Sequence, residues 1–245
     1  MYTKIKKNLF QIIPKNFILK NEVWLRNLHY HLFYKGNNHE CSICKKKVKQ
    51  FLKNHNHLIC PNCGSIQRNR RLWQLLDQEF IINNTTILDF SPSRVLFRKL
   101  KNNKKINYIS TDFENEFIAD YSFDITNIDL KSKSIHLIIC YHILEHIEND
   151  KKAMQELFRI LKNGGKALIQ TPFKDGEIYE DYSITDPEER KIHFGQEDHV
   201  RFYSIDGLKN RLENEGFNVE IRKFDKEEYY LGLETNETIL ICHKE

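Results

Sequence analysis

The stretch that decides the fold is "SIHLIICYHILEHIENDKKAMQELFRILKNGGKALIQTPF", residues 134–173. It opens with an apolar run, closes with a second one, and spaces its apolar residues at helical intervals over 149–162. A buried strand, a helix and a further buried strand in this order predict a βαβ unit with two parallel strands.

The alternation of strands and helices continues on both sides of this stretch. Strand-like segments lie at 85–90, 106–113, 135–142, 166–173, 217–224 and 237–244, and helix-like segments at 149–162 and 204–216. Such an order predicts an α/β fold with a doubly wound, mostly parallel sheet. Only a loop separates the last two strands, so we expect them to form an antiparallel pair at one edge.

Four of the six cysteines follow metal-ligand spacing, C-x2-C-x15-C-x2-C, at Cys41, Cys44, Cys60 and Cys63. Two such knuckles can place four thiolates around one tetrahedral Zn²⁺. Disulfides or a redox dithiol are the alternatives, but no secretion signal indicates an oxidising compartment. Since cysteine fills all four positions, the pattern predicts a structural zinc site without an open coordination position.

The charge distribution divides the chain near residue 80. Residues 1–80 carry a net charge of +11 and residues 81–245 a net charge of −7. This change of sign predicts two modules. We expect 1–80 to hold an N-terminal helix, the zinc module and a linking helix, and 81–245 to hold the α/β sheet.

Two helical segments of the first module carry further expectations. An apolar stripe at helical spacing is predicted to be core: Val23, Leu25, Leu28, Leu32 and Phe33. Arg68, Arg70 and Arg71 open the linking helix. They are candidates either for binding phosphate or nucleic acid, or for docking on the acidic second module.

The ends of the strands carry the candidate cofactor residues, because ligands of such sheets bind beyond the carboxyl ends. The first strand runs through "ILDFSPSR", 87–94, into a turn of Ser91, Pro92 and Ser93 without glycine. Asp112 follows the second strand about 20 residues later, where a carboxylate can accept the ribose hydroxyls. Asp89 fits either a helix cap or the cofactor. Asp124 fits either an exocyclic amine or a turn.

The stretch 134–173 resembles the type 11 group of class I S-adenosylmethionine-dependent methyltransferases, and the resemblance covers roughly residues 85–243. The cysteine knuckles, the "SPSR" turn and "DHVRFY", 198–203, resemble a bacterial subfamily of the same enzymes. The resemblance implies a Rossmann-like methyltransferase fold with a seven-stranded sheet, and S-adenosylmethionine as the cofactor.

The resemblance also implies a set of cofactor-binding residues: Asp89, Ser91, Pro92, Ser93, Asp112, Phe113, Asp124, Ile125, Tyr141 and His142. The first turn departs from the family's G-x-G-x-G pattern. Hydroxyl groups of Ser91 and Ser93, with the charge of Arg94, are expected to replace the missing backbone contacts.

The acceptor side is expected around "HFGQEDHVRFY", 193–203, a stretch with little helical pattern. Methyl transfer often needs a base, and the candidates are His199, His142 and His193, with His199 preferred on the resemblance. Arg201 and Tyr203 are the candidate substrate-binding residues. The alternative is a hydrogen-bonded surface loop. Cys140 and Cys242 are expected to be buried apolar residues rather than nucleophiles.

The sequence therefore predicts a cytoplasmic S-adenosylmethionine-dependent methyltransferase with a structural zinc. By resemblance, its acceptor is a small molecule or a glycan precursor. The alternatives are a nucleic-acid- or protein-binding module on an inactive methyltransferase fold, and an RNA or protein methyltransferase. Nucleic acid ranks lower, because the lysines are scattered and no aromatic-rich basic stripe is present. No apolar run approaches the roughly 20 residues of a membrane span.

Overall fold

The computed structural model describes residues 15–114, 116–226, 228–233 and 236–245. The chain forms two compact units. The first, here called the cysteine unit, comprises the chain up to Leu75 together with Lys226–Thr235. The second, the sheet unit, comprises Leu76–Asp225 and Asn236–Glu245.

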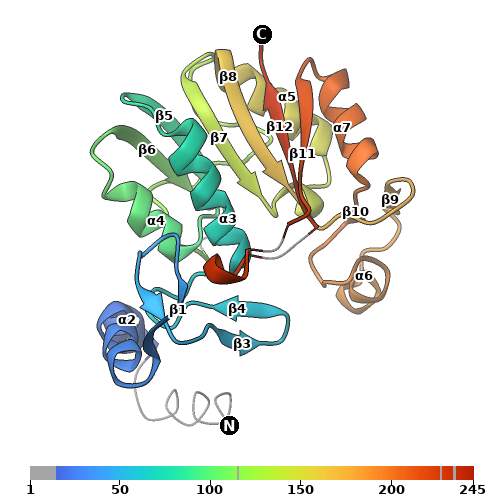
Figure 1. The fold of residues 1–245 in the computed structure, drawn as a ribbon. Helices are drawn as coiled ribbons and strands as arrows, with labels where there is room; N and C mark the ends of the chain where they lie inside the picture. Colours follow the sequence, from blue (N-terminus) through green and yellow to red (C-terminus); the bar gives the residue numbers. More distant parts are fainter. Residues whose placement is uncertain (1–14, 115, 227, 234–235) are drawn as a thin grey trace. The chain divides into compact units, whose positions relative to one another are not determined.

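The sheet unit is built on a six-stranded sheet with the order β11-β12-β8-β7-β5-β6 (Figure 1). Its strands are β5 (Thr85–Phe90), β6 (Ile106–Thr111), β7 (Ile135–Tyr141), β8 (Leu161–Gln170), β11 (Asn218–Phe224) and β12 (Glu237–His243). Strands β5 to β8 are mutually parallel, whereas β12 runs antiparallel to both β8 and β11. The predicted doubly wound fold and its antiparallel edge pair are confirmed.

The seven strands implied by the resemblance are not all formed in the described part of the chain. Beyond β6, the sheet continues only as a single bridge between Thr111 and Tyr121. The nearby Asp120 is held by hydrogen bonds from Lys101 and Ser110, and its own backbone N–H bonds the carbonyl of Ser110. These contacts fold the segment back on the end of β6 and leave no length for a strand.

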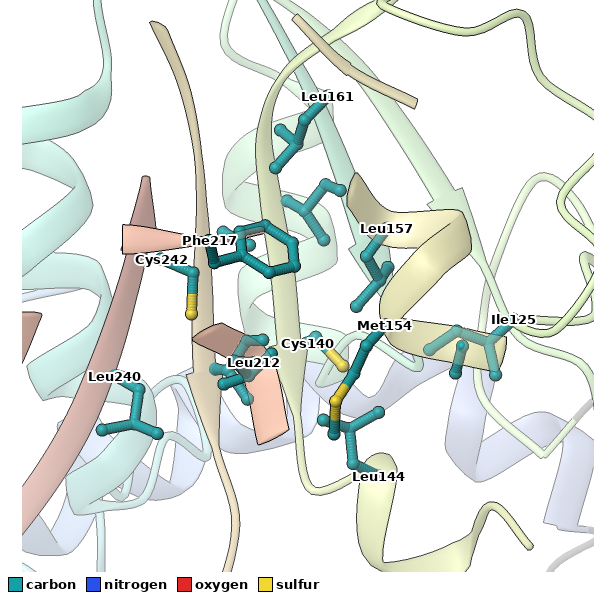
Figure 2. Packing of buried hydrophobic residues seen from close by; sticks show 14 of the residues in the cluster. Ile125, Cys140, Leu144, Met154, Leu157, Leu161, Leu212, Phe217, Leu240 and Cys242 are labelled. Carbon is teal, nitrogen blue, oxygen red and sulfur yellow. The ribbon is translucent and has the colours of Figure 1, made fainter. Parts of the chain in front are cut away.

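One face of the sheet is covered by α5 (Asp150–Ile160) and α7 (Ile205–Asn214). The Asn149 side chain caps α5 by accepting from the Lys152 backbone N–H at 3.1 Å. Figure 2 shows Cys140 of β7 pointing toward Met154 and Leu157 of α5, and all three are fully buried. Cys242 lies in the same core, so the apolar role predicted for both cysteines is confirmed. A further helix, α4 (Arg94–Lys101), packs on β6.

A folded excursion, here called the β9–β10 lobe (residues 171–204), connects β8 to α7. It contains β9 (Tyr179–Glu180), α6 (Pro187–Phe194) and β10 (Arg201–Phe202), and the two strands pair antiparallel. Asp186 caps α6 and precedes a proline at the first position, while Gly195 ends the helix with a φ of 83°. Ile184, Phe194 and Phe202 give the lobe its own small core.

The cysteine unit consists of short elements. They are α2 (Lys15–His29), η1 (Tyr30–Tyr34), the hairpins β1 (Lys35–Glu40) with β2 (Lys47–Val48) and β3 (Leu52–Asn54) with β4 (His57–Ile59), and α3 (Gln67–Leu75). The prediction that the apolar stripe is buried is wrong for four of its residues. They are 44–65% exposed: Val23, Leu28, Leu32 and Phe33. Tyr30 takes the buried position instead, and its hydroxyl donates to the Lys47 carbonyl.

The arginines of α3 are used inside the cysteine unit. Arg70 is fully buried and donates to the carbonyls of Ser65, Leu58 and Gly232. Arg71 is also buried and pairs with Glu228 at 2.8 Å. Neither guanidinium is available to nucleic acid, so that alternative is wrong for these two residues.

None of the helices in the described ranges has the length and apolar character needed to cross a membrane.

Candidate functional site

The four predicted zinc ligands lie together in the cysteine unit. The sulfurs of Cys41 and Cys63 are 3.6 Å apart, those of Cys44 and Cys60 are 3.8 Å apart, and all four lie within 4.8 Å of one another. Tetrahedral zinc with Zn–S bonds of about 2.3 Å holds its sulfurs about 3.8 Å apart, whereas a disulfide is about 2.05 Å long. The donor set therefore fits zinc, and all six cysteines are free of disulfides.

The two knuckles share one pattern of backbone hydrogen bonds. The N–H of Lys45 bonds the Cys41 carbonyl at 2.8 Å, and the N–H of Gly64 bonds the Cys60 carbonyl at 2.9 Å. Both Lys45 and Gly64 adopt positive φ, at 56° and 80°. Ser65, which sequence reasoning missed, places its hydroxyl 3.4 Å from the Cys41 sulfur and 3.2 Å from that of Cys63. Such contacts orient ligands from outside the coordination sphere.

The candidate cofactor residues of the sheet unit follow aligned strand ends. Phe90 at the end of β5 lies opposite Thr111 of β6 and Cys140 of β7, and Tyr141 lies opposite Gln170 of β8. The chain therefore leaves the same edge of the sheet after each parallel strand. This is the edge at which ligands of open α/β sheets bind.

The turn after β5 adopts a conformation that normally favours glycine. Ser91 has a φ of 46°, a left-handed value that most L-residues avoid. Its N–H bonds the Thr111 carbonyl at 2.7 Å, and its hydroxyl donates to Asp112 Oδ1 at 2.6 Å. Pro92 is buried directly after it. The serine thus adopts a conformation typical of glycine, and its side chain links the turn to the end of β6.

Asp112 lies where the sequence predicts it, 4% exposed at the end of β6. Its Oδ1 accepts from Ser91, and its Oδ2 accepts from the Phe117 backbone N–H at 2.9 Å. The carboxylate is therefore oriented by donors on both oxygens. Phe113, next in the chain, is 57% exposed.

Of the two roles expected for Asp89, the helix cap is wrong, because its side chain caps no helix. It accepts from the Tyr108 hydroxyl at 2.9 Å. Burial raises the pKa of Asp89 to about 7, although this hydrogen bond acts in the opposite direction.

Asp124 forms a turn, which is one of the two roles expected for it. Its Oδ1 accepts from both the N–H and the hydroxyl of Thr126 at 2.8 Å. Ile125, between them, is buried.

A cluster of titratable side chains follows β7. His142 has a φ of 57°, and its Nδ1 lies 3.2 Å from Glu145 Oε1. His146 Nδ1 lies 3.1 Å from Asp198 Oδ2, and the rings of His146 and His199 meet edge to face at 4.7 Å. Sequence reasoning gave Glu145 and His146 no place in the site, although "LEH" is part of the motif it singled out.

His199 is not an exposed loop residue; it is 2% exposed. Its Nδ1 lies 3.1 Å from the Phe194 carbonyl, and burial and the neighbouring His146 lower its pKa. His193 lies outside the cluster on an exposed position, with its Nδ1 2.9 Å from the Tyr179 hydroxyl. The three histidines proposed for catalysis are thus not brought together as one group.

Arg201 and Tyr203, expected to bind substrate, are both fully buried and internally bonded. Arg201 donates to Glu180 at 2.8 Å and to the carbonyls of Leu144, Ile147 and Glu148. The Tyr203 hydroxyl donates to Asp150. Their donors tie the β9–β10 lobe to the loop after β7. This arrangement argues against direct substrate contact by either residue.

Several buried polar atoms along the carboxyl edge have no hydrogen-bond partner among the described residues. They are the Ser93 hydroxyl, the Tyr141 hydroxyl, both Glu145 carboxylate oxygens, the Gln170 amide oxygen and the Thr171 hydroxyl. Native proteins pair the great majority of such atoms, so those at this edge call for further partners, such as water or a ligand.

A cavity of 460 Å³ opens at the end of β8 and continues toward β11 and β12. Its walls include Gln170, Thr171, Lys174, Ser204, Asp206 and Lys223. None of the predicted cofactor residues lines it. Its volume is in the range of small-molecule sites.

Comparison with known proteins gives a family match and structural neighbours. A family model described as "Methyltransferase domain" matches residues 35–220. An uncharacterised protein of Methanocaldococcus jannaschii is 32% identical over 90 residues, which cover 35% of this chain and 36% of that protein. The chain thus matches about a third of that relative's length.

Three solved structures share the fold. An S-adenosylmethionine-dependent methyltransferase of Archaeoglobus fulgidus aligns with a TM-score of 0.52 and 17% identity, covering 71% of this chain and 91% of its own. An S-adenosylmethionine-dependent methyltransferase of Mesorhizobium loti aligns with a TM-score of 0.52 and 14% identity. The alignment covers 69% of this chain and 95% of that protein. Phosphoethanolamine N-methyltransferase 2 of Haemonchus contortus, solved with S-adenosylmethionine, aligns with a TM-score of 0.51 and 15% identity. The alignment covers 72% of this chain and 52% of that protein.

Proposed function

The chain belongs to the methyltransferase-domain family, and on this premise we propose that it transfers a methyl group from S-adenosylmethionine to a small-molecule acceptor. The observation that carries the proposal is the carboxyl edge of the sheet. There, the buried Asp112 follows β6 beside a turn in a glycine-like conformation, and polar atoms without partners follow β5, β7 and β8.

The residues of this edge fit the proposed cofactor in chemical type. Asp112 would accept the ribose hydroxyls, and Asp124 with Ile125 would contact the adenine. Ser91, Pro92 and Ser93 would bind the amino-acid end, and the Ser93 hydroxyl is a buried donor without a partner among the described residues. The remaining proposed contacts come from Asp89, Phe113, Tyr141 and His142. When bound, S-adenosylmethionine supplies an electrophilic methyl group on a positively charged sulfur.

This chain's own part in the reaction is to position the acceptor and to accept its proton where one must leave. Because the Phe194 carbonyl can only accept, Nδ1 of His199 carries the hydrogen and Nε2 keeps its lone pair. Burial lowers the pKa of His199 and so favours the neutral ring. His199 and His142 are therefore proposed at the reacting end, and the role first given to His193 has no further support.

We propose a small molecule or a glycan precursor as the acceptor class. The cavity at the end of β8 has a volume of 460 Å³, which suits a small molecule, and its wall includes Lys174 and Lys223, but His142 and His199 do not line it. A nucleic-acid acceptor has less support, since Arg70 and Arg71 are buried in the cysteine unit. Zn²⁺ at the four cysteines is proposed as a structural ion, because four thiolates fill a tetrahedral site.

Asp112→Ala tests the cofactor proposal. Loss of charge-assisted hydrogen bonds costs on the order of 1.5–3 kcal/mol, so we expect S-adenosylmethionine to bind at least about tenfold more weakly in calorimetry. Asp129→Ala, at an exposed position, is the matched control and should bind as the wild type does. Equal affinity of a folded Asp112→Ala protein and the wild type would refute the assignment.

A salt series separates the proposed function from the binding-module alternative. A nucleic-acid-binding module would bind generic RNA or DNA with an affinity that falls steeply with salt and would not bind S-adenosylmethionine. The proposed enzyme binds the cofactor, and any nucleic-acid affinity remains weak at physiological salt.

A further inference from the structure

Three potential metal ligands converge just beyond β7, in the sheet unit. Glu145 and His146 belong to η3 (Leu144–His146), and His199 comes from the β9–β10 lobe. Their nearest ligand atoms all lie within 4.8 Å of one another. A backbone hydrogen bond from the Val200 N–H to the Glu145 carbonyl, at 2.9 Å, ties the two segments together.

Glu145 is the first independent sign of a ligand at this cluster. It is 1% exposed, and neither carboxylate oxygen has a hydrogen-bond partner among the described residues. His142 Nδ1 lies at ion-pair distance, 3.2 Å from Oε1, but outside hydrogen-bond geometry. A buried carboxylate without donors is costly unless a cation neutralises it. The burial of Glu145 therefore points to a positive charge within the cluster.

The two histidines are oriented in the way that metal ligands are oriented. Nδ1 of His146 faces Asp198 Oδ2 at 3.1 Å, and Nδ1 of His199 faces the Phe194 carbonyl at 3.1 Å. The Phe194 carbonyl can only accept, so Nδ1 of His199 carries the hydrogen and its Nε2 presents a lone pair. For His146, the Asp198 carboxylate at ion-pair distance from Nδ1 favours the same tautomer. Metal-bound histidines almost always donate their other ring N–H to a carboxylate or backbone carbonyl in this manner.

We propose that Glu145, His146 and His199 bind a divalent transition-metal ion of the zinc type through one carboxylate oxygen and two Nε2 atoms. Two histidines and one carboxylate suit such ions, and imidazole nitrogen disfavours Mg²⁺ and Ca²⁺. Donors at about 2.1 Å from an ion lie at most about 4.2 Å apart, so small side-chain rotations complete the site. Metal binding uses the Nε2 lone pair of His199, so with the ion bound His142 is the remaining candidate base. The site itself does not depend on the proposed methyl transfer.

This site differs in kind from the cysteine centre. The four thiolates fill a tetrahedron, whereas three protein ligands leave coordination positions open for water or for an oxygen of a bound small molecule. The ion also supplies the positive charge that Glu145 lacks. His142, beside Glu145, is a neighbour of the site and not one of its three ligands.

Cobalt distinguishes the two centres in the intact protein. Full-length protein, as purified, is titrated with Co²⁺ at neutral pH and followed by absorption. The proposal predicts one further Co²⁺ per chain with ligand-field bands and without the sulfur-to-cobalt charge transfer that thiolate ligands produce. Absence of such a spectrum in the wild type overturns the proposal and leaves a hydrogen-bonded cluster of histidines and Glu145.

Variants assign the site to its residues. Glu145→Gln, which keeps the side-chain volume, and His199→Ala should each weaken Co²⁺ binding at this centre at least about tenfold. His146→Asn repeats the test at a less buried ring, in case His199→Ala does not fold. His193→Ala, outside the cluster and exposed, is the control and should bind as the wild type does. Undiminished binding by folded Glu145→Gln protein overturns the proposal.

Discussion

The two units of this chain reach stability by different means. The sheet unit has one continuous core, in which β7, β8, α5 and α7 contribute fully buried aliphatic residues. In the cysteine unit, three of the four strands are only two or three residues long, and Arg70 is fully buried at its centre. Strands of that length cannot bury enough apolar surface to offset their ordering entropy. The difference teaches that packing stabilises the sheet unit, whereas the cysteine unit needs its polar contacts and the metal proposed for its four thiolates.

Removing one zinc ligand should have the largest effect and should affect one unit only. Cys60→Ser is expected to lose the metal and to unfold the cysteine unit, because metal binding supplies about 10–16 kcal/mol of apparent folding free energy in zinc-finger peptides. Elemental analysis and limited proteolysis check this. Cys242→Ala, at a buried cysteine of the sheet unit, is the control and should keep the metal. Full metal content in Cys60→Ser would contradict the comparison.

Leu157→Ala tests the sheet unit, whose stability is expected to come from packing and not from a metal. Leu157 is fully buried in the sheet core, so its truncation should lower the free energy of unfolding by about 2–5 kcal/mol. Chemical denaturation followed by circular dichroism measures the loss. The metal content of the folded protein should stay the same. A change in metal content would mean that the two units do not keep separate sources of stability.

Asp89→Asn should have a pH-dependent effect within the sheet unit. Burial raises the pKa of Asp89 to about 7, so between about pH 4 and pH 7 the folded state keeps a proton that the unfolded state has lost. Wild-type stability therefore falls as pH rises through this window, whereas asparagine has no proton to lose. A shift of about 3 units corresponds to at most about 4 kcal/mol.

The measurement is the difference in unfolding free energy between Asp89→Asn and the wild type. We expect it to rise in favour of asparagine from about pH 4 to pH 7 and to level off above. Tyr108 can donate to the amide oxygen as it does to the carboxylate, so the hydrogen bond is retained. A difference that does not vary with pH would show that Asp89 is not protonated in the folded state.

Gly232→Ala should have the smallest and most local effect. Gly232 has a φ of 61°, and a Cβ there would overlap a ring carbon of Phe51, within the cysteine unit. Strain and overlap should cost about 1–3 kcal/mol and raise hydrogen exchange over 228–233. Gly164→Ala, at a positive φ of 76° with no atom within 4 Å, isolates the overlap from the backbone strain. Equal effects of both variants would mean that contact with Phe51 contributes nothing.

Much of the fold follows from the sequence alone. β5 begins and ends where its apolar run does, at Thr85 and Phe90, and α5 lies inside its predicted range. The cysteine spacing predicts the cluster at Cys41 to Cys63, and the position of Asp112 after the second strand predicts its place at the carboxyl edge. Each of these features is local: the periodicity of side chains and the lengths of chain between them decide which way a residue faces.

Only the tertiary structure decides which distant residues meet. No sequence pattern predicts that His199 lies against His146 and near Glu145, some fifty residues earlier. Nor does any pattern predict that the Arg201 guanidinium donates its hydrogen bonds to carbonyls after β7. The same holds for the buried Tyr30 in place of the apolar stripe on α2 and η1, and for the seventh strand, which does not form among the described residues. The periodicity of apolar residues indicates which side chains are buried. Which residues then contact one another depends on the path of the chain and on the competition between groups for the same hydrogen-bond donors and acceptors.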